Sequence, residues 1–179
     1  LIKDQTRLKN RLKTQTLAIT QCQTKARLAQ IKRHLTALQS EMESRINACP
    51  KRTRSYAILR SIPGIGQVAA TATLIACPEI GALGKKQVAC LAGLAPMTRQ
   101  SGTWRGKAFI QGGRKNLRDA LYMPALVAFR YNPDMKDKYR TMINAGKPAK
   151  LALTAIMRKL IELANTLIKD DREWKPKLA

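Results

Sequence analysis

The sequence has few acidic residues and a single histidine, and both shortages exclude classes of function. Its 179 residues include 34 Lys and Arg but only 11 Asp and Glu, for a formal net charge of +23. A field of this sign attracts polyanions, so nucleic acid is the first candidate partner. Because His34 is the only histidine and lies far along the chain from Ser101, we set aside a Ser-His-Asp triad.

Paired cysteines and long apolar runs are also lacking. Cys22, Cys49, Cys77 and Cys90 form no Cys-x-x-Cys pair, and with one histidine they give too few sensibly spaced ligands for zinc. We expect reduced, mostly buried thiols, as in a cytoplasmic protein. No apolar stretch is long enough to cross a bilayer, and the polar, basic N-terminus is unlike a signal peptide. Since the chain begins at Leu1, we expect it to be a fragment of a longer protein.

Residues 1–47 contain neither Gly nor Pro, which predicts one long helix and, over residues 1–50, a coiled-coil dimerisation region. Apolar residues alternate spacings of three and four along its second half: Leu28, Ile31, Leu35, Leu38 and Met42. Upstream, from Leu1 to Ala26, the pattern is out of phase and is interrupted at Gln5 and Gln15, which indicates a stutter or a change of partner. The alternative is packing on its own domain. Eight basic residues and no acid lie between Asp4 and Glu41, so this helix can also contact nucleic acid.

Residues 51–179 predict a compact helical domain, so the fold class is mainly α. Two apolar segments over 58–76 flank Pro-Gly-Ile-Gly, the pattern of a helix-hairpin-helix element. Gly64 and Gly66 would allow the tight turn, and backbone N–H groups at the next helix start would face a phosphate. The alternative is an ordinary helical hairpin without a ligand.

Further helical segments are expected in the rest of the domain. We predict short helices within 78–95 and longer ones over 114–131, from 133 to about 144, and from 148 to about 169, with 117–130 at the centre. The tail from Asp170 is expected to be loose. Met123, Met142 and Met157 are expected in the core.

A glycine-rich, strongly basic loop surrounds Ser101, and residues 98–110 predict a short β-hairpin. The basic residues around it, with no acid between Glu79 and Asp119, are Arg99, Arg105, Lys107, Arg114, Lys115 and Arg118. Arginine forks bind phosphate oxygens bidentately, so we expect these six to bind nucleic acid. From the residues alone, Ser101 either donates a hydrogen bond to a phosphate or attacks it. Trp104 either stacks on a base or anchors the loop.

A series of motifs carries a resemblance over about residues 55–175. They are Gly-Leu-Ala-Pro at 93–96, Gln-Ser-Gly at 100–102, Arg-Gly-Lys at 105–107, Gly113, Leu-Arg-Asp-Ala-Leu-Tyr-Met at 117–123, Asn-Pro at 132–133, Tyr139, Gly-Lys-Pro at 146–148 and Met-Arg-Lys-Leu at 157–160. This series closely resembles the C-terminal domain of the bridge-RNA-guided DEDD/serine transposases (recombinases) of bacterial insertion sequences. The resemblance implies that Ser101 is a catalytic nucleophile toward DNA and that a coiled coil precedes the serine domain.

The same resemblance implies partners and a further domain. Members of this family work with DNA and a guide (bridge) RNA, and we expect a homo-oligomer in the prokaryotic cytoplasm, associated with the nucleoid. They carry an N-terminal RuvC-like domain whose acidic residues hold Mg²⁺. The first 118 residues here contain only Asp4, Glu41, Glu43 and Glu79 as acids, so no cofactor is expected in this chain, and the isolated chain should be nearly inactive.

Two other functions fit the residues. One is a non-catalytic helix-hairpin-helix module that binds DNA without sequence preference. The other is a basic RNA-binding scaffold. A pure binding module needs no serine in an arginine-rich loop, so the consequence of replacing Ser101 separates these readings from the first.

Overall fold

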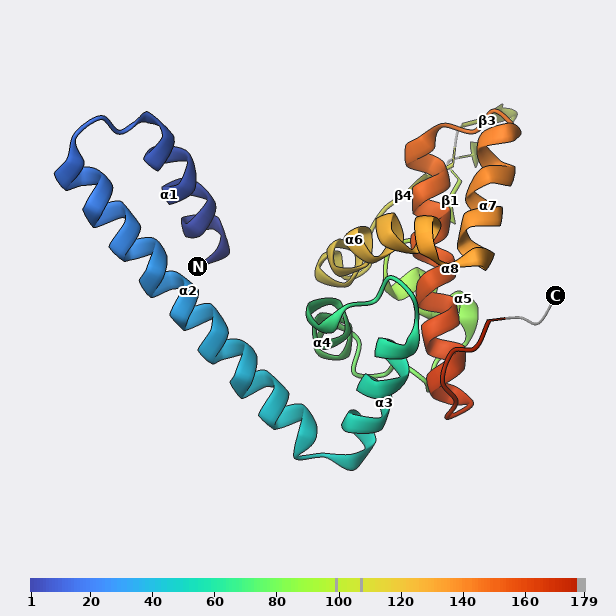
Figure 1. Ribbon diagram of the computed structural model, residues 1–179. Helices are drawn as coiled ribbons and strands as arrows, with labels where there is room; N and C mark the ends of the chain where they lie inside the picture. The colour runs from blue at the N-terminus through green and yellow to red at the C-terminus, as the bar shows by residue number, and fades with distance from the viewer. Residues whose placement is uncertain (99, 107, 177–179) are drawn as a thin grey trace. The chain divides into compact units, whose positions relative to one another are not determined.

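A computed structural model describes residues 1–98, 100–106 and 108–176, with the backbone alone at Trp104 and Arg105. The described chain is mainly α, as predicted, with eight helices and two short antiparallel strand pairs (Figure 1). No helix among these residues has the length and apolar character needed to cross a membrane. The chain divides into two compact units, Leu1–Cys49 and Pro50–Ala179.

The first unit is a helical hairpin of α1 (Ile2–Thr14) and α2 (Ala18–Asn47). The prediction of one uninterrupted helix over 1–47 was therefore wrong. Gln15 and Leu17 have extended backbones, and the side-chain amide of Gln21 donates to the Gln15 carbonyl at 2.8 Å. The helix α1 packs on α2, so the chain turns back on itself at Gln15–Leu17, and the shift of phase between Ala26 and Leu28 lies inside α2.

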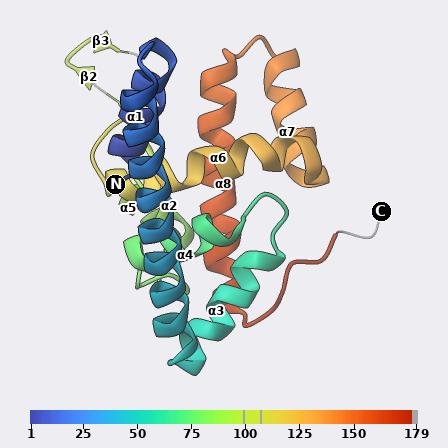
Figure 2. The same cartoon turned by 60° about the vertical axis from the view of Figure 1, so that its left-hand side comes forward.

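The second unit is built around α6 (Lys115–Tyr131), which contacts α4 (Gln67–Ala76), α7 (Pro133–Asn144) and α8 (Ala149–Lys169) (Figure 2). This confirms the central position predicted for 117–130. The helix α3 (Pro50–Ser61) precedes α4, and within 78–95 a single α-helix forms, α5 (Lys85–Leu91). Helix ends follow local chemistry: Pro133 begins α7, and Gly146 ends it with φ of +73°.

The core of this unit is aliphatic. Its fully buried side chains include Leu59, Leu117, Leu121, Ile156, Leu160 and Ile161. Met157 is buried as predicted, but Met123 is 63% exposed, because it lies on the face of α6 opposite Leu121 and Ala125. The cysteines were also predicted mostly buried, and of the four only Cys77 is; Cys22 and Cys90 are exposed.

The segment after α8 is anchored, contrary to the loose tail predicted from Asp170. The Arg54 guanidinium on α3 donates to Asp171 at 2.8 Å and to Glu173 at 2.9 Å. The backbone N–H of Trp174 donates to the Ser61 hydroxyl at 2.9 Å, and the Trp174 side chain packs against the core. Partners more than 110 residues apart hold this segment, so no local pattern announces it.

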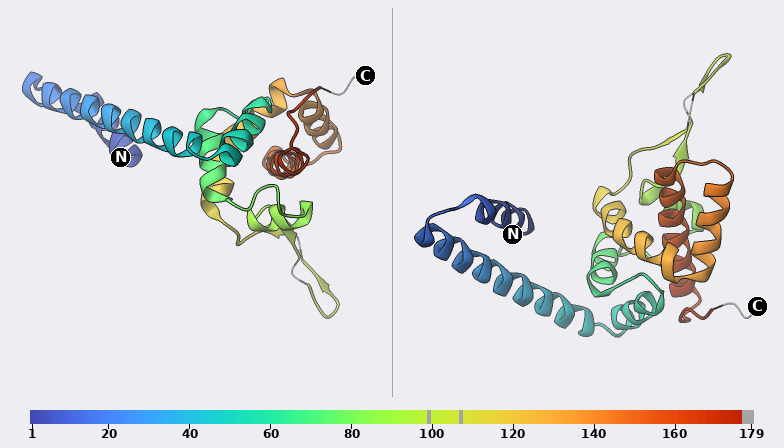
Figure 3. Two further views of the ribbon diagram at one scale, coloured as in Figure 1. Left: turned by 90° about the horizontal axis from the view of Figure 1, so that it is seen from below. Right: turned by 45° about the horizontal axis from the view of Figure 1, so that its top comes forward.

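Between α5 and α6, where one short hairpin was predicted, the chain forms two successive antiparallel strand pairs, an inner tier and an outer tier. The inner tier pairs β1 (Pro96–Met97) with β4 (Phe109–Ile110), and the outer tier pairs β2 (Gln100–Ser101) with β3 (Trp104–Arg105). Figure 3 shows these strands projecting away from the helices of their own unit. We call the four strands the Ser101 hairpin.

Candidate functional site

Ser101 lies in the outer tier of the Ser101 hairpin, in register with Trp104. The turn that follows uses Gly102 with φ of +56°, a conformation that side chains with a Cβ rarely adopt. Gln100, Ser101 and Thr103 are all exposed. The hydroxyl is therefore presented where a large substrate can reach it, which a buried serine could not offer.

The basic residues nearest Ser101 in sequence fall on the part that is not described. Arg99 and Lys107 lie outside the described residues, and the side chains of Arg105 and Trp104 do as well. Their roles as phosphate ligands or as a stacking partner stay predictions. What the structure places is the other half of the predicted basic set, at the start of α6.

Arg114, the N-cap residue of α6, is held by an acid from far along the chain. Its guanidinium donates two bonds to the Glu79 carboxylate, at 2.7 and 2.8 Å, and a third to the Ala76 carbonyl at 2.9 Å. These bonds lower the pKa of Glu79 to about 2 and raise the pKa of Arg114. Burial raises the pKa of the adjacent Cys77 thiol, and the Glu79 charge adds to that shift. The Arg114 guanidinium is therefore already paired with Glu79 inside the protein.

The other two cations at the start of α6 also have partners inside the molecule. Lys115 forms an ion pair with Asp119, one turn further along α6. Arg118 donates from one terminal nitrogen to the Gly112 carbonyl at 2.8 Å and to the Ala92 carbonyl at 3.3 Å. Glu79 and Asp119 are the acids on either side of the acid-free stretch, and in the structure they pair with Arg114 and Lys115.

The two glycines predicted to grip a phosphate have different surroundings. Gly64 has φ of +105°, and a Cβ there would lie 2.8–2.9 Å from the Pro124 carbonyl oxygen and from Ala128 of α6. Gly66 is the N-cap residue of α4, and a Cβ there would meet no atom within 4 Å. Gly64 therefore serves helix packing, whereas a side chain at Gly66, at the N-terminus of α4, would meet free space.

An apolar groove of about 410 Å³ adjoins that N-terminus. It lies between α4 and α6, and its lining includes Val68, Met123, Val127 and Asp119. An anion would find few polar partners in it.

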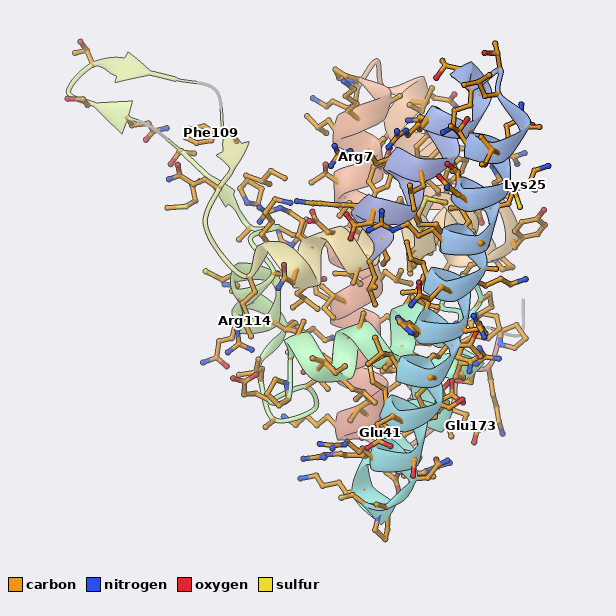
Figure 4. All side chains as sticks on the ribbon, turned by 90° about the vertical axis from the view of Figure 1, so that its left-hand side faces the viewer. Arg7, Lys25, Glu41, Phe109, Arg114 and Glu173 are labelled. Atoms are coloured by element: carbon orange, nitrogen blue, oxygen red, sulfur yellow. The ribbon has the colours of Figure 1, made fainter. Side chains whose placement is uncertain are left out.

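The first unit carries its own basic surface. All eight basic residues between Asp4 and Glu41 are exposed, among them Arg7 on α1 and Lys25 on α2 (Figure 4). Cations spaced along a helical hairpin suit the regular charge of a nucleic-acid backbone. Sequence reasoning identified this stretch but assigned none of its residues to a site.

The site thus combines an exposed serine on a projecting hairpin with glycines and arginines where that hairpin joins α6. The helices of the first unit add a basic surface. Residues 56–140 match the family model described as Transposase IS116/IS110/IS902 family. This part of the chain is therefore similar to the transposases of the IS116/IS110/IS902 family. The matched range contains Ser101, Arg114 and Arg118.

The chain is also similar to curated proteins whose names refer to DNA rearrangement or to insertion elements. A pilin gene-inverting protein of Moraxella bovis is 34% identical over 144 residues, and one of Moraxella lacunata is 33% identical over the same length. Both alignments cover 78% of this chain. An insertion element IS110 protein of Streptomyces coelicolor is 28% identical over 141 residues, covering 76% of this chain. The chain spans 45% of the length of each Moraxella relative and 35% of the Streptomyces one.

Proposed function

We propose that this chain is the serine-bearing part of a DNA transposase or recombinase, with Ser101 as the nucleophile that cleaves a DNA strand. The observation that carries the proposal is the exposed Ser101 at the end of a projecting hairpin, within the range that matches the transposase family. Relatives whose names state gene inversion or an insertion element support DNA rearrangement as the reaction class. Binding to DNA would also place the protein on the nucleoid.

The chemistry is a phosphoryl transfer that conserves bonds. The Ser101 Oγ attacks a backbone phosphorus, the new Oγ–P bond forms, and the P–O bond to one deoxyribose breaks. The freed sugar oxygen takes up a proton, and the DNA end remains as a phosphoserine ester. A sugar hydroxyl of another strand then attacks that ester, rejoins the DNA and releases the serine, so no external energy source is needed.

Two groups of this chain would assist the attack. A serine hydroxyl is a weak nucleophile at its ordinary pKa, so a positive neighbour must lower the cost of the alkoxide. Arg99 and Arg105 flank Ser101 in the sequence and are the candidates. They would also neutralise the charge that develops on the phosphorus oxygens, where a catalytic group contributes most.

The rest of the machinery is proposed from the resemblance alone. The described residues bring no three His, Cys, Asp or Glu side chains together as a metal site, so no step is assigned to a metal held by this chain. We propose that the whole protein carries a RuvC-like domain that holds Mg²⁺, and that it works with a guide RNA and a second protomer. The Moraxella relatives are about twice as long as the matched segment, which leaves room for such a domain.

The test uses the whole protein with its guide RNA and DNA, and measures covalent protein–DNA adducts on a denaturing gel. Ser101→Ala should abolish the adducts while DNA binding stays nearly intact, and Ser101→Cys should keep weak activity, because a thiolate forms more easily. Thr103→Ala is the matched control, an exposed hydroxyl in the same turn. If Ser101→Ala recombines DNA at the normal rate, the hydroxyl is only a phosphate ligand.

The second candidate is a DNA-binding helical hairpin without catalysis, favoured by the free space beside Gly66 at the start of α4. Under that function, Gln67→Glu would place a negative charge at the first position of α4 and weaken DNA binding, whereas Ser101→Ala would change nothing. Preference for RNA over DNA in a competition experiment would instead favour the RNA-binding scaffold.

A further inference from the structure

The two ends of the Ser101 hairpin cross at a pair of glycines. On the entering side, Gly93 ends α5 with φ of +66°, and Leu94 N–H bonds to the Ala89 carbonyl at 2.9 Å, the pattern of a Schellman cap. On the leaving side, Gly113 has φ of +64°. Both ends therefore require conformations that favour glycine.

The crossing leaves no space for side chains. A Cβ on Gly113 would overlap the backbone of Gly93, and a Cβ on Gly93 would overlap the Gly112 carbonyl and the Arg118 guanidinium. The backbone at Gly93 thus lies directly against the backbone at Gly112 and Gly113. Such contact fixes their separation, because neither side has a rotatable group that can yield.

Hydrogen bonds from the start of α6 fasten this crossing. The Arg114 backbone N–H donates to the Leu91 carbonyl at 2.7 Å. Arg118 bridges the two sides: one nitrogen donates to Gly112 on the leaving side and to Ala92 on the entering side. A single half-buried guanidinium therefore ties both ends of the hairpin to α6.

The Ser101 hairpin has too few internal contacts to fix its own direction. Its strands are two residues long, and Met97, Phe109 and Ile110, the large apolar side chains described in its inner tier, are exposed by 36–47%. An isolated two-stranded ribbon is marginally stable in water. The direction in which Ser101 projects must therefore be set at the base.

We infer that Arg118 is a positioning residue, which clamps the Gly93–Gly113 crossing and so fixes the direction of the Ser101 hairpin. This inference rests on the proposed function of Ser101. It replaces the sequence interpretation of Arg118 as a nucleic-acid ligand. Nucleophilic attack on phosphorus tolerates little misplacement, and a shift of about 1 Å can cost on the order of 10²-fold in rate.

The test compares Arg118→Met, which keeps the length of the side chain but no donor, with Arg118→Lys, whose ammonium can still donate to both carbonyls. Arg140→Met is the matched control, since Arg140 is an exposed arginine on α7. In this chain, hydrogen exchange is measured at residues 91–94 and 109–113, together with the salt dependence of DNA binding. In the whole protein, the single-turnover rate of adduct formation is measured at saturating DNA.

Arg118→Met should speed exchange at the crossing, leave the salt slope unchanged, and lower the adduct rate about 10²-fold at unchanged DNA affinity. Arg118→Lys should recover most of the rate, and Arg140→Met should leave exchange at the crossing unchanged. A salt slope reduced by about one with unchanged exchange would make Arg118 a phosphate ligand and overturn the inference. Unchanged exchange and unchanged rate would overturn it as well. If Ser101→Ala still forms adducts while Arg118→Met loosens the crossing, the proposed function fails and the clamp stands.

Discussion

The two compact units solve the burial of apolar surface differently. The second unit, 50–179, encloses its own core, with Leu59, Leu117 and Leu160 fully buried. The first unit, 1–49, has no fully buried residue on α1, and Ile2, Ile19 and Leu38 are 70%, 69% and 51% exposed. Both units are basic and helical, so composition does not separate them. The second unit buries its apolar side chains against one another, whereas the first leaves large apolar side chains exposed.

Their cations differ in the same sense. In the second unit, arginines hold the fold together: Arg54 fastens the C-terminal segment, Arg114 binds Glu79, and Arg118 ties the hairpin base. In the first unit, the eight cations between Asp4 and Glu41 all face solvent. A count of Lys and Arg therefore overstates how many cations of the second unit are free to bind phosphate. In the first unit the same count is a better measure of that number.

The largest predicted effect tests how tightly the second unit is packed. Gly64→Ala should destabilise it by about 2–6 kcal/mol, the sum of backbone strain at positive φ and overpacking against α6. Gly66→Ala is the matched control and should stay within about 1 kcal/mol, because its site is open and its φ is negative. Urea unfolding followed by circular dichroism measures both. Equal effects for the two glycines would mean that close packing on α6 is not what Gly64 provides.

A smaller effect concerns the ion pair behind the hairpin base. The hydrogen bonds from Arg114 hold the pKa of Glu79 at about 2, below its ordinary 4.5. The carboxylate therefore contributes stability that is complete above about pH 4.5 and is lost as the pH falls toward 2. The melting temperature of Glu79→Gln should lie below that of the unaltered protein near neutral pH, and the gap should close between these two pH values.

A double-mutant cycle assigns that gap to its cause. Arg114→Gln combined with Glu79→Gln should show coupling at pH 6 and little coupling near pH 2, since protonation of Glu79 removes the charged partner. A melting-temperature gap that is the same at every pH would contradict the ion pair as its origin.

How much the sequence predicted depended on the range of the interactions involved. Pro133, Gly146 and Pro148 act locally, and the helix ends near them were predicted correctly. The hairpin around Ser101 was also predicted, because glycine punctuation is local. The break at Gln15–Leu17 has no Gly or Pro to signal it and follows from α1 packing on α2. The pairs Arg114–Glu79 and Arg54–Asp171 join residues 35 and 117 positions apart, and only the tertiary fold brings them together.

The smallest predicted effect on stability bears on the first unit and its unused apolar surface. The helix α1 packs on α2, leaving Leu35 half-buried, while Leu38 and Met42 remain exposed on the same stripe. We predict that this exposed end joins two copies of the chain. Leu38→Asp should lower the mass measured by sedimentation from that of a dimer to that of a monomer, because it places a charge in the apolar contact. Since Leu38 is exposed within one chain, the unfolding free energy of the second unit should change by less than about 0.5 kcal/mol. Ala29→Asp is the matched control: nine positions away it lies on the opposite face of α2, and the dimer should persist. An unchanged mass for Leu38→Asp would show that the stripe does not join copies of the chain, and the first unit would then be a basic arm whose apolar residues only hold α1 against α2.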